Sequence, residues 1–143
     1  MGRIKIDLPQ RRLAKVSVPV RITDINYGNH LGNDAVVSII HEARMQWLQL
    51  NGHTEMDICG TSLIMSDLAV SFKNEAFYPD MIDVELRMGE LSRVGFDVYY
   101  CLTTLRNDTP LTIALAKTGM VCFNYKEKKI EPVPEGLQRL LIQ

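Results

Sequence analysis

A short polar segment between residues 24 and 34 carries the residue types that could do chemistry in this chain. It holds two carboxylates, three amides and one imidazole, at Asp24, Asp34, Asn26, Asn29, Asn33 and His30. Carboxylates and imidazoles accept protons near neutral pH, whereas amides donate and accept hydrogen bonds. Polar groups at this density, placed directly before an apolar helix whose first N–H groups are free, indicate a binding or catalytic site.

The helix that follows is predicted over residues 34–50. Its apolar residues recur at spacings of three and four, which is the pattern of a helix with one buried face. They are Val36, Ile39, Ile40, Ala43, Trp47 and Leu50. Asn33 or Asp34 is expected to cap the start of this helix, and Gly52 fits its end.

Strands are predicted on both sides of this helix. Apolar and polar residues alternate over 16–22, where Pro19 favours an edge strand, and further strands are predicted over 63–72, 82–91, 94–105 and 111–125. A short helix is expected over 135–142. One strand, a long helix and four strands, mostly antiparallel, predict an α+β sheet with one central helix in a single domain over 1–143.

Composition excludes several classes of function. The formal net charge is −1, from 16 basic and 17 acidic residues, so the overall charge does not indicate a nucleic-acid-binding protein. No apolar run approaches the ~20 residues that span a bilayer, and the first residues lack the apolar stretch of a secretory signal. Three cysteines without paired spacing favour reduced thiols in a cytoplasmic protein. His41 and His53 have no metal-ligand spacing, so neither a metal nor a cofactor is expected.

The polar segment and the helix together resemble a known family motif. Residues 24–33 read DINYGNHLGN and are followed by Glu42-Ala43-Arg44, similar to a D-x-D-x-x-G-H-V-N-N loop and a helical E-A-R. This is the pattern of hotdog-fold thioesterases, in particular the 4-hydroxybenzoyl-CoA thioesterase-like acyl-CoA thioesterases, and the resemblance covers roughly residues 16–141. It implies an antiparallel sheet of about five strands wrapped around one long central helix. It also implies a homodimer, or a homotetramer, that hydrolyses acyl-CoA.

One departure from the motif affects the chemistry. Asn26 stands where many relatives carry the catalytic carboxylate, and an amide neither takes a proton at neutral pH nor attacks well. Gly32 and Asn29 also differ from the usual residues. A thioester hydrolase would therefore need its base at Asp34, Glu42 or His30, with Asn26 orienting a water. Asp34 as a first-turn acid and His30 as a loop anchor are equally ordinary interpretations.

The resemblance also implies substrate-binding groups. The backbone N–H of Asn33, at the helix start, is the best candidate to hold the oxyanion. Arg93, Lys73 and Arg87 are candidates to bind the phosphates of coenzyme A, and Arg93 is the first of them. The residues that could line the acyl pocket, or equally belong to the core, are Tyr27, Val37, Ile40 and Met65.

Two other functions remain open from the sequence. A non-catalytic protein that binds acyl-CoA or an acyl carrier would explain the loss of the carboxylate at Asn26. A hotdog hydratase or dehydratase is the weaker alternative, because His30 and Asp34 fit its arrangement loosely. Hydrolysis of a thioester panel separates the first two functions, and water addition to an enoyl-CoA tests the third.

Overall fold

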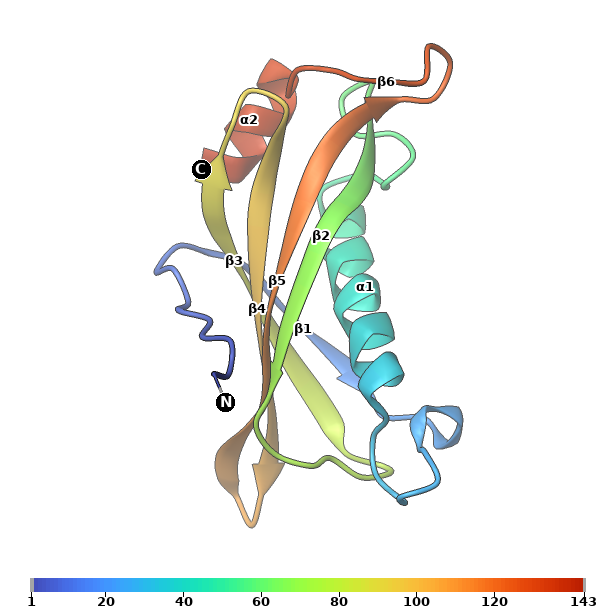
Figure 1. Cartoon of the computed structure of the whole chain (residues 1–143), viewed down its shortest axis with the longest axis vertical. Helices are drawn as coiled ribbons and strands as arrows, with labels where there is room; N and C mark the ends of the chain where they lie inside the picture. Colours follow the sequence, from blue (N-terminus) through green and yellow to red (C-terminus); the bar gives the residue numbers. More distant parts are fainter. Residues whose placement is uncertain (1, 143) are drawn as a thin grey trace.

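Alternating apolar residues build the strands of one antiparallel sheet. The computed structural model describes residues 2–142. Its elements are β1 (Arg12–Pro19), a 3-10 turn (Ile22–Asp24), α1 (Asn33–Leu50), β2 (Ser62–Phe72), β3 (Met81–Leu91), β4 (Gly95–Arg106), β5 (Thr109–Asn124), β6 (Lys129–Ile130) and α2 (Glu135–Ile142). The strand order is β1-β3-β4-β5-β2, and the two-residue β6 pairs with β5 (Figure 1). Strands β1 and β2 therefore form the two edges.

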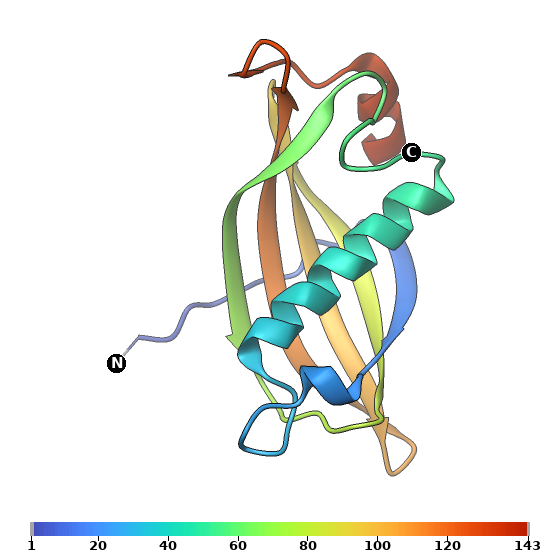
Figure 2. The same ribbon diagram turned by 90° about the vertical axis from the view of Figure 1, so that its right-hand side faces the viewer.

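Helix α1 lies diagonally across one face of this sheet (Figure 2). Its apolar stripe supplies Ala43, Trp47 and Leu48 to the core, all at most 2% exposed. The inward side chains of β3 and β4, including Val84 and Leu102, are completely buried in the same cluster. The stripe explains this position, because a helix with one apolar face must cover it with another apolar surface.

The predicted elements are present, and differences occur at their ends. The first strand begins at Arg12 and ends at Pro19 on the edge strand β1, as the proline suggested. The predicted strand continues to Ile22, whereas β1 ends at Pro19 because the chain turns away from the sheet there. The next residue, Val20, donates its N–H to Asp80 O at 2.9 Å. Helix α2 has the predicted limits.

The predicted cap of α1 is wrong. Gly32 occupies the N-cap position without a side-chain hydrogen bond, Asn33 is the first helical residue, and Asp34 lies in the first turn. The N–H of Gly32 is already held by Asp24 O at 3.0 Å, so the loop backbone fixes where the helix starts. Gly52, with φ of +78°, follows the helix end as expected.

The structure confirms an α+β fold. It has an antiparallel sheet of six strands and, within residues 2–142, the two helices α1 and α2. The wrapping of the sheet around a single central helix stays a prediction. Within residues 2–142, none of the helices combines the length and apolar character needed to cross a membrane.

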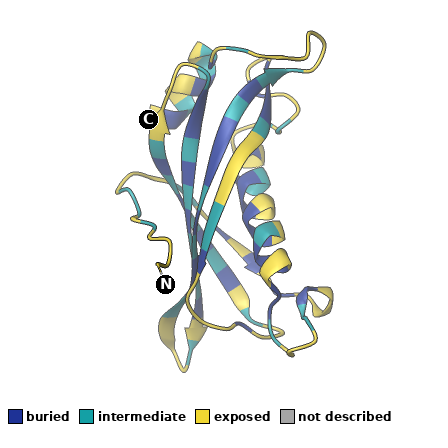
Figure 3. Cartoon of the chain, in the orientation of Figure 1, coloured by how far each residue is buried: buried dark blue, intermediate teal, exposed yellow. Residues whose placement is uncertain are grey.

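The edge strand β2 is irregular and partly exposed. Its pairing with β5 shifts between Met65 and Asp67, so Ser66 forms a bulge. Figure 3 shows the exposed middle of this strand, where Met65 and Leu68 are 45% and 37% exposed. The bulge places these two side chains, three residues apart, on the side of the strand that faces α1, where both line one cavity.

Candidate active site

The loop between β1 and α1 is braced by the buried carboxylate of Asp24. Its Oδ2 accepts the backbone N–H of Arg21 at 2.8 Å, and its Oδ1 accepts Nη2 of the Arg21 guanidinium at 3.2 Å. This side-chain hydrogen bond raises the pKa of Arg21. Because both of its oxygens accept hydrogen bonds from Arg21, the Asp24 carboxylate serves to hold the shape of the loop.

Asn26 closes a tight turn at the tip of the loop. Its Oδ1 accepts the Gly28 N–H at 2.9 Å, and its backbone O accepts the Asn29 N–H at 3.0 Å. Asn29 adopts φ of +67°, a conformation that asparagine tolerates better than most residues. The Nδ2 amide makes no hydrogen bond within residues 2–142, so it can donate one to a ligand. The side-chain oxygen has a second lone pair and can also accept a bond from a water.

His30 lies beside this turn and is half-buried. Its Nδ1 is 3.2 Å from the Leu31 carbonyl oxygen. A carbonyl can only accept, so Nδ1 donates this hydrogen bond. The Nε2 atom and the Asn26 Oδ1 atom both flank Gly28, at 3.1 and 3.2 Å from where a Cβ would stand.

The start of α1 brings Asp34 next to Asn26. A Cβ added at Gly32 would stand 2.7 Å from Asp34 Oδ1 and 3.5 Å from Asn26 Cβ. The two side chains thus flank the same glycine, which leaves room for a carboxylate beside the amide. The backbone N–H groups of Asn33, Asp34 and Ala35 have no hydrogen-bond partner among residues 2–142, so they form a ready set of donors.

A cavity of about 200 Å³ lies between this helix start and the end of β2. Three predicted site residues, His30, Asn33 and Lys73, line it together. Val36 and Phe72 supply apolar walls. The structure therefore brings the imidazole, the helix start and one cation to a single opening.

A second cavity, of about 260 Å³, lies further along the groove between α1 and β2. It is lined by three residues that the sequence suggested for an acyl pocket, Val37, Ile40 and Met65. Leu63, Leu68 and Thr118 line it as well, together with the polar side chains of His41, Arg44 and Glu55.

Glu42 lies on the other side of α1. It lines a groove of about 380 Å³ toward β1, which also contains Arg21, Asp24 and Met45. Its Oε2 accepts Nε2 of Gln46 at 2.7 Å. The structure thus separates Glu42 from the cavity of His30 and Lys73.

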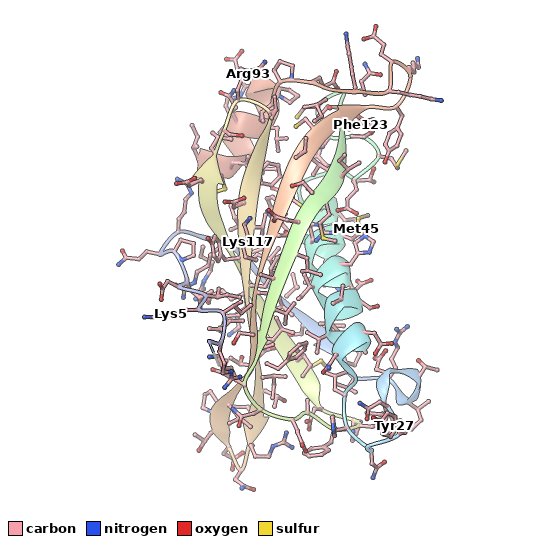
Figure 4. All side chains as sticks on the ribbon, in the orientation of Figure 1. Lys5, Tyr27, Met45, Arg93, Lys117 and Phe123 are labelled. Carbon is pink, nitrogen blue, oxygen red and sulfur yellow. The ribbon has the colours of Figure 1, made fainter. Side chains whose placement is uncertain are left out.

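Two predicted substrate-binding residues lie apart from these cavities. Tyr27 is fully exposed at the tip of the loop. Arg93 lies in the turn between β3 and β4, at the opposite end of the molecule from Tyr27 (Figure 4). Its backbone O accepts the Val133 N–H at 2.8 Å. Within one protomer, Arg93 does not reach the loop.

Sequence reasoning missed a buried polar network around Arg44. Arg44 is 5% exposed, and its Nε donates to Glu55 Oε2 at 2.6 Å. Its Nη1 donates to Tyr100 Oη at 3.1 Å, and Tyr100 Oη lies 2.7 Å from Thr118 Oγ1. The sequence held one signal of this network, because Arg44 falls on the apolar face of the predicted helix between Ile40 and Trp47.

Comparisons with known proteins identify the family and the fold. The sequence pattern of the thioesterase-like superfamily matches residues 20–141. No curated protein sequence matches this chain.

Three solved structures illustrate the shared fold. The PA2801 protein of Pseudomonas aeruginosa superposes with a TM-score of 0.81 at 22% identity, covering 90% of this chain and 98% of that one. A 1,4-dihydroxy-2-naphthoyl-CoA thioesterase from Synechocystis gives a TM-score of 0.78 at 21% identity, with 89% and 93% covered. The BH1999 gentisyl-coenzyme A thioesterase gives 0.76 at 15% identity, with 87% and 99% covered. At these identities the superpositions establish the fold, whereas the match over residues 20–141 establishes membership: the chain belongs to the thioesterase-like superfamily of hotdog proteins.

Proposed function

We propose that this protein is an acyl-CoA thioesterase whose catalytic carboxylate is Asp34. One observation carries the proposal: Asp34 Oδ1 and the Asn26 side chain flank Gly32, so a carboxylate from α1 lies beside the position where relatives of this type carry theirs. Family membership supports thioester hydrolysis, and the unpaired N–H groups at the start of α1 support an oxyanion site.

In the proposed reaction, the thioester carbonyl binds with its oxygen toward the Asn33 N–H. Asp34 takes a proton from a water while the water oxygen bonds to the carbonyl carbon, and the carbonyl electrons move to the oxygen at the helix start. The intermediate then breaks its C–S bond, and the coenzyme A sulfur receives the proton from Asp34. The products are the free acid and coenzyme A. Asn26 Nδ2 orients the water or the carbonyl, and His30 holds the loop through its bond to Leu31.

We propose that Lys73, which lines the cavity beside the helix start, attracts a phosphate of coenzyme A. Arg93 lies at the far end of its own protomer, so a role in coenzyme A binding requires a second copy. We propose a homodimer formed along the free edge of β2, where Met65, Leu68 and Phe72 are exposed. Antiparallel pairing of β2 with its copy would bring the far end of one protomer toward the loop of the other.

Release of free thiol from aliphatic and aromatic acyl-CoA esters tests the activity. Wild-type protein should turn over at least one ester, and Asp34→Asn should lower kcat by about 10²- to 10⁴-fold, the usual contribution of a general base. Glu90→Gln, at an exposed carboxylate near the end of β3, is the matched control and should retain kcat.

Other outcomes would overturn the assignment. If Glu42→Gln loses activity and Asp34→Asn remains active, the catalytic base is Glu42, on the other side of α1. An inactive wild type that becomes active as Asn26→Asp would identify a binding protein that has lost hydrolysis.

A further inference from the structure

The cavity between α1 and β2 has aliphatic walls and a polar end. Val37, Ile40, Leu63 and Leu68 form the walls, and no phenylalanine, tyrosine or tryptophan among residues 2–142 lines it. Arg44 and Glu55 form the polar end. This cavity and the one that His30, Asn33 and Lys73 line both lie between α1 and β2, at successive positions along the helix.

One atom at this polar end lacks a partner. Arg44 donates through Nε to Glu55 and through Nη1 to Tyr100, but its Nη2 makes no hydrogen bond within residues 2–142. No fully buried side-chain nitrogen or oxygen among these residues is without a partner, so Nη2 keeps some accessible surface, and Arg44 is one of the residues that line this cavity. A buried ion pair contributes little net stability compared with apolar side chains of the same size. Because Nη2 makes no hydrogen bond within residues 2–142, it can donate one to a ligand that enters the cavity.

The charges of the network determine which kind of ligand group Arg44 Nη2 can bind. Burial acts to lower the pKa of Arg44, but Tyr100 and Glu55 outweigh it, so the pKa lies above its usual value and Arg44 stays charged. Burial raises the pKa of Tyr100, which stays a neutral phenol. Glu55 compensates the guanidinium, and its two oxygens are taken by Arg44 and by Nε2 of His41 at 2.7 Å. A second carboxylate would be repelled by Glu55 and an ammonium by Arg44, whereas a neutral oxygen fits.

The length of the groove limits the ligand. A helix rises 1.5 Å per residue, so the backbone of Arg44 lies about 16 Å along the axis from that of Asn33. Helical side chains lean toward the N-terminus, which brings the guanidinium back to roughly 10–16 Å from the proposed oxyanion donor. Such a length with aliphatic walls suits an extended acyl chain better than a single aromatic ring.

We propose that this cavity binds the acyl chain of the substrate and that Arg44 Nη2 selects aliphatic chains with a hydroxyl or carbonyl oxygen near the distal end. The inference rests on the proposed thioesterase function and adds its substrate class. Arg44 is a specificity-determining residue in this assignment and does not contact the reacting bond.

Matched pairs of substrates test the assignment: octanoyl-CoA with 8-hydroxyoctanoyl-CoA, and dodecanoyl-CoA with 12-hydroxydodecanoyl-CoA. Wild-type kcat/KM should favour the hydroxylated member of at least one pair by about 10- to 100-fold, the effect of a hydrogen bond to a charged group. In the double variant Arg44→Met/Glu55→Gln the ratio should fall to about one. The double change is needed because removing Arg44 alone would leave Glu55 without its charged partner. The equivalent change Arg139→Met/Glu135→Gln in the exposed pair of α2 should keep the wild-type ratio.

A wild-type ratio of one or less for both pairs would overturn the inference, whatever the stability of the variants. An unchanged preference in the folded Arg44→Met/Glu55→Gln protein would also overturn it, since a purely structural role of the pair leaves the ratio alone. If wild type hydrolyses none of these esters, the proposed function fails, and calorimetric titration with the same pairs still decides. Tighter binding of the hydroxylated esters would support the pocket, and equal binding would reject it.

Discussion

At the scale of single residues, two side chains of nearly equal size in one loop have different tasks. Asp24 is buried, and its oxygens accept the backbone and guanidinium N–H groups of Arg21. Asn26 is half-buried, its oxygen closes the turn at Gly28, and its Nδ2 makes no hydrogen bond within residues 2–142. The hydrogen bonds of each residue, which its chemical type alone does not reveal, separate the loop brace from the group that can face a ligand.

Gly32 provides a test at this scale. Its φ of −72° suits alanine, but the new Cβ would stand 2.7 Å from Asp34 Oδ1 and displace that flexible carboxylate. We expect Gly32→Ala to change the free energy of unfolding by no more than about 1 kcal/mol, because a surface side chain can rotate away. We expect kcat to fall by about 10- to 100-fold, as for other small misplacements of a catalytic group. Urea unfolding and thiol release measure the two quantities.

Epistasis supplies the control for Gly32→Ala. If the glycine acts through Asp34, the double variant Gly32→Ala/Asp34→Asn should be no slower than Asp34→Asn alone. Additive losses would show that the glycine affects activity by another route.

At the scale of elements, the sheet depends on close approach between neighbouring strands. Strands β4 and β5 pair over a long register that begins at Gly95↔Val121. A Cβ at Gly95 would stand 2.2 Å from the backbone O of Met120, which a folded pair of strands cannot accommodate. The bulge at Ser66 in β2 is one of several register shifts in the sheet, and it faces Gly119 of β5, whose N–H donates to Asp67 Oδ1 at 2.9 Å.

Gly95→Ala should therefore destabilise the protein by about 2–4 kcal/mol, since backbone atoms must separate. Gly119→Ala is the matched change in the neighbouring strand, and its close contacts are the side-chain ends of Ser66 and Asp67, which can move. Chemical unfolding should show the smaller loss for Gly119→Ala. Equal losses would contradict the importance of the backbone contact.

Strand β5 also buries a thiol that links stability to pH. Burial raises the pKa of Cys122 from 9.0 to about 11. Between these values the unfolded chain loses the proton while the folded chain keeps it, so the free energy of unfolding should fall by about 2 kcal/mol as the pH rises from 9 to 11. Urea unfolding across this range should show a smaller decline for Cys122→Ala. The exposed thiol of Cys59 is the control, and Cys59→Ala should keep the wild-type decline. A Cys122→Ala curve parallel to wild type would refute the assignment.

At the scale of the whole molecule, the protomer leaves the edge of β2 open. The partly exposed side chains of Met65, Leu68 and Phe72 lie along that edge, and the same residues line the cavities of the α1–β2 groove. Arg93 and the loop lie at opposite ends of one chain (Figure 4), so a site that used both would be shared between two protomers.

The proposed dimer predicts a specific sensitivity. Wild-type protein at micromolar concentration should have the mass of a dimer or a tetramer by light scattering, and Leu68→Glu should shift the mass toward the monomer, because a buried charge on the shared edge lacks a partner. Leu105→Glu, at an exposed residue near the β4–β5 turn, should leave the mass unchanged. A monomeric wild type would reject the shared site.

The sequence by itself determined the elements of this protein. The three- and four-residue spacing of apolar residues predicted α1, alternation predicted the strands, and the run from Asp24 to Asn33 predicted where polar groups gather. These properties are local, because each depends on residues within a few turns or pairs of one another. Pro19 marked an edge strand for the same reason, since its missing N–H is a property of one residue.

Only the tertiary structure decided which of these groups meet. It placed Asp34 beside Asn26 across Gly32, separated Glu42 from His30 on opposite sides of one helix, and buried Arg44 against Glu55 and Tyr100. It also placed the bulge at Ser66 and set Arg93 at the far end of the sheet. These outcomes depend on strand register and on packing between residues distant in sequence, and local patterns carry no record of either.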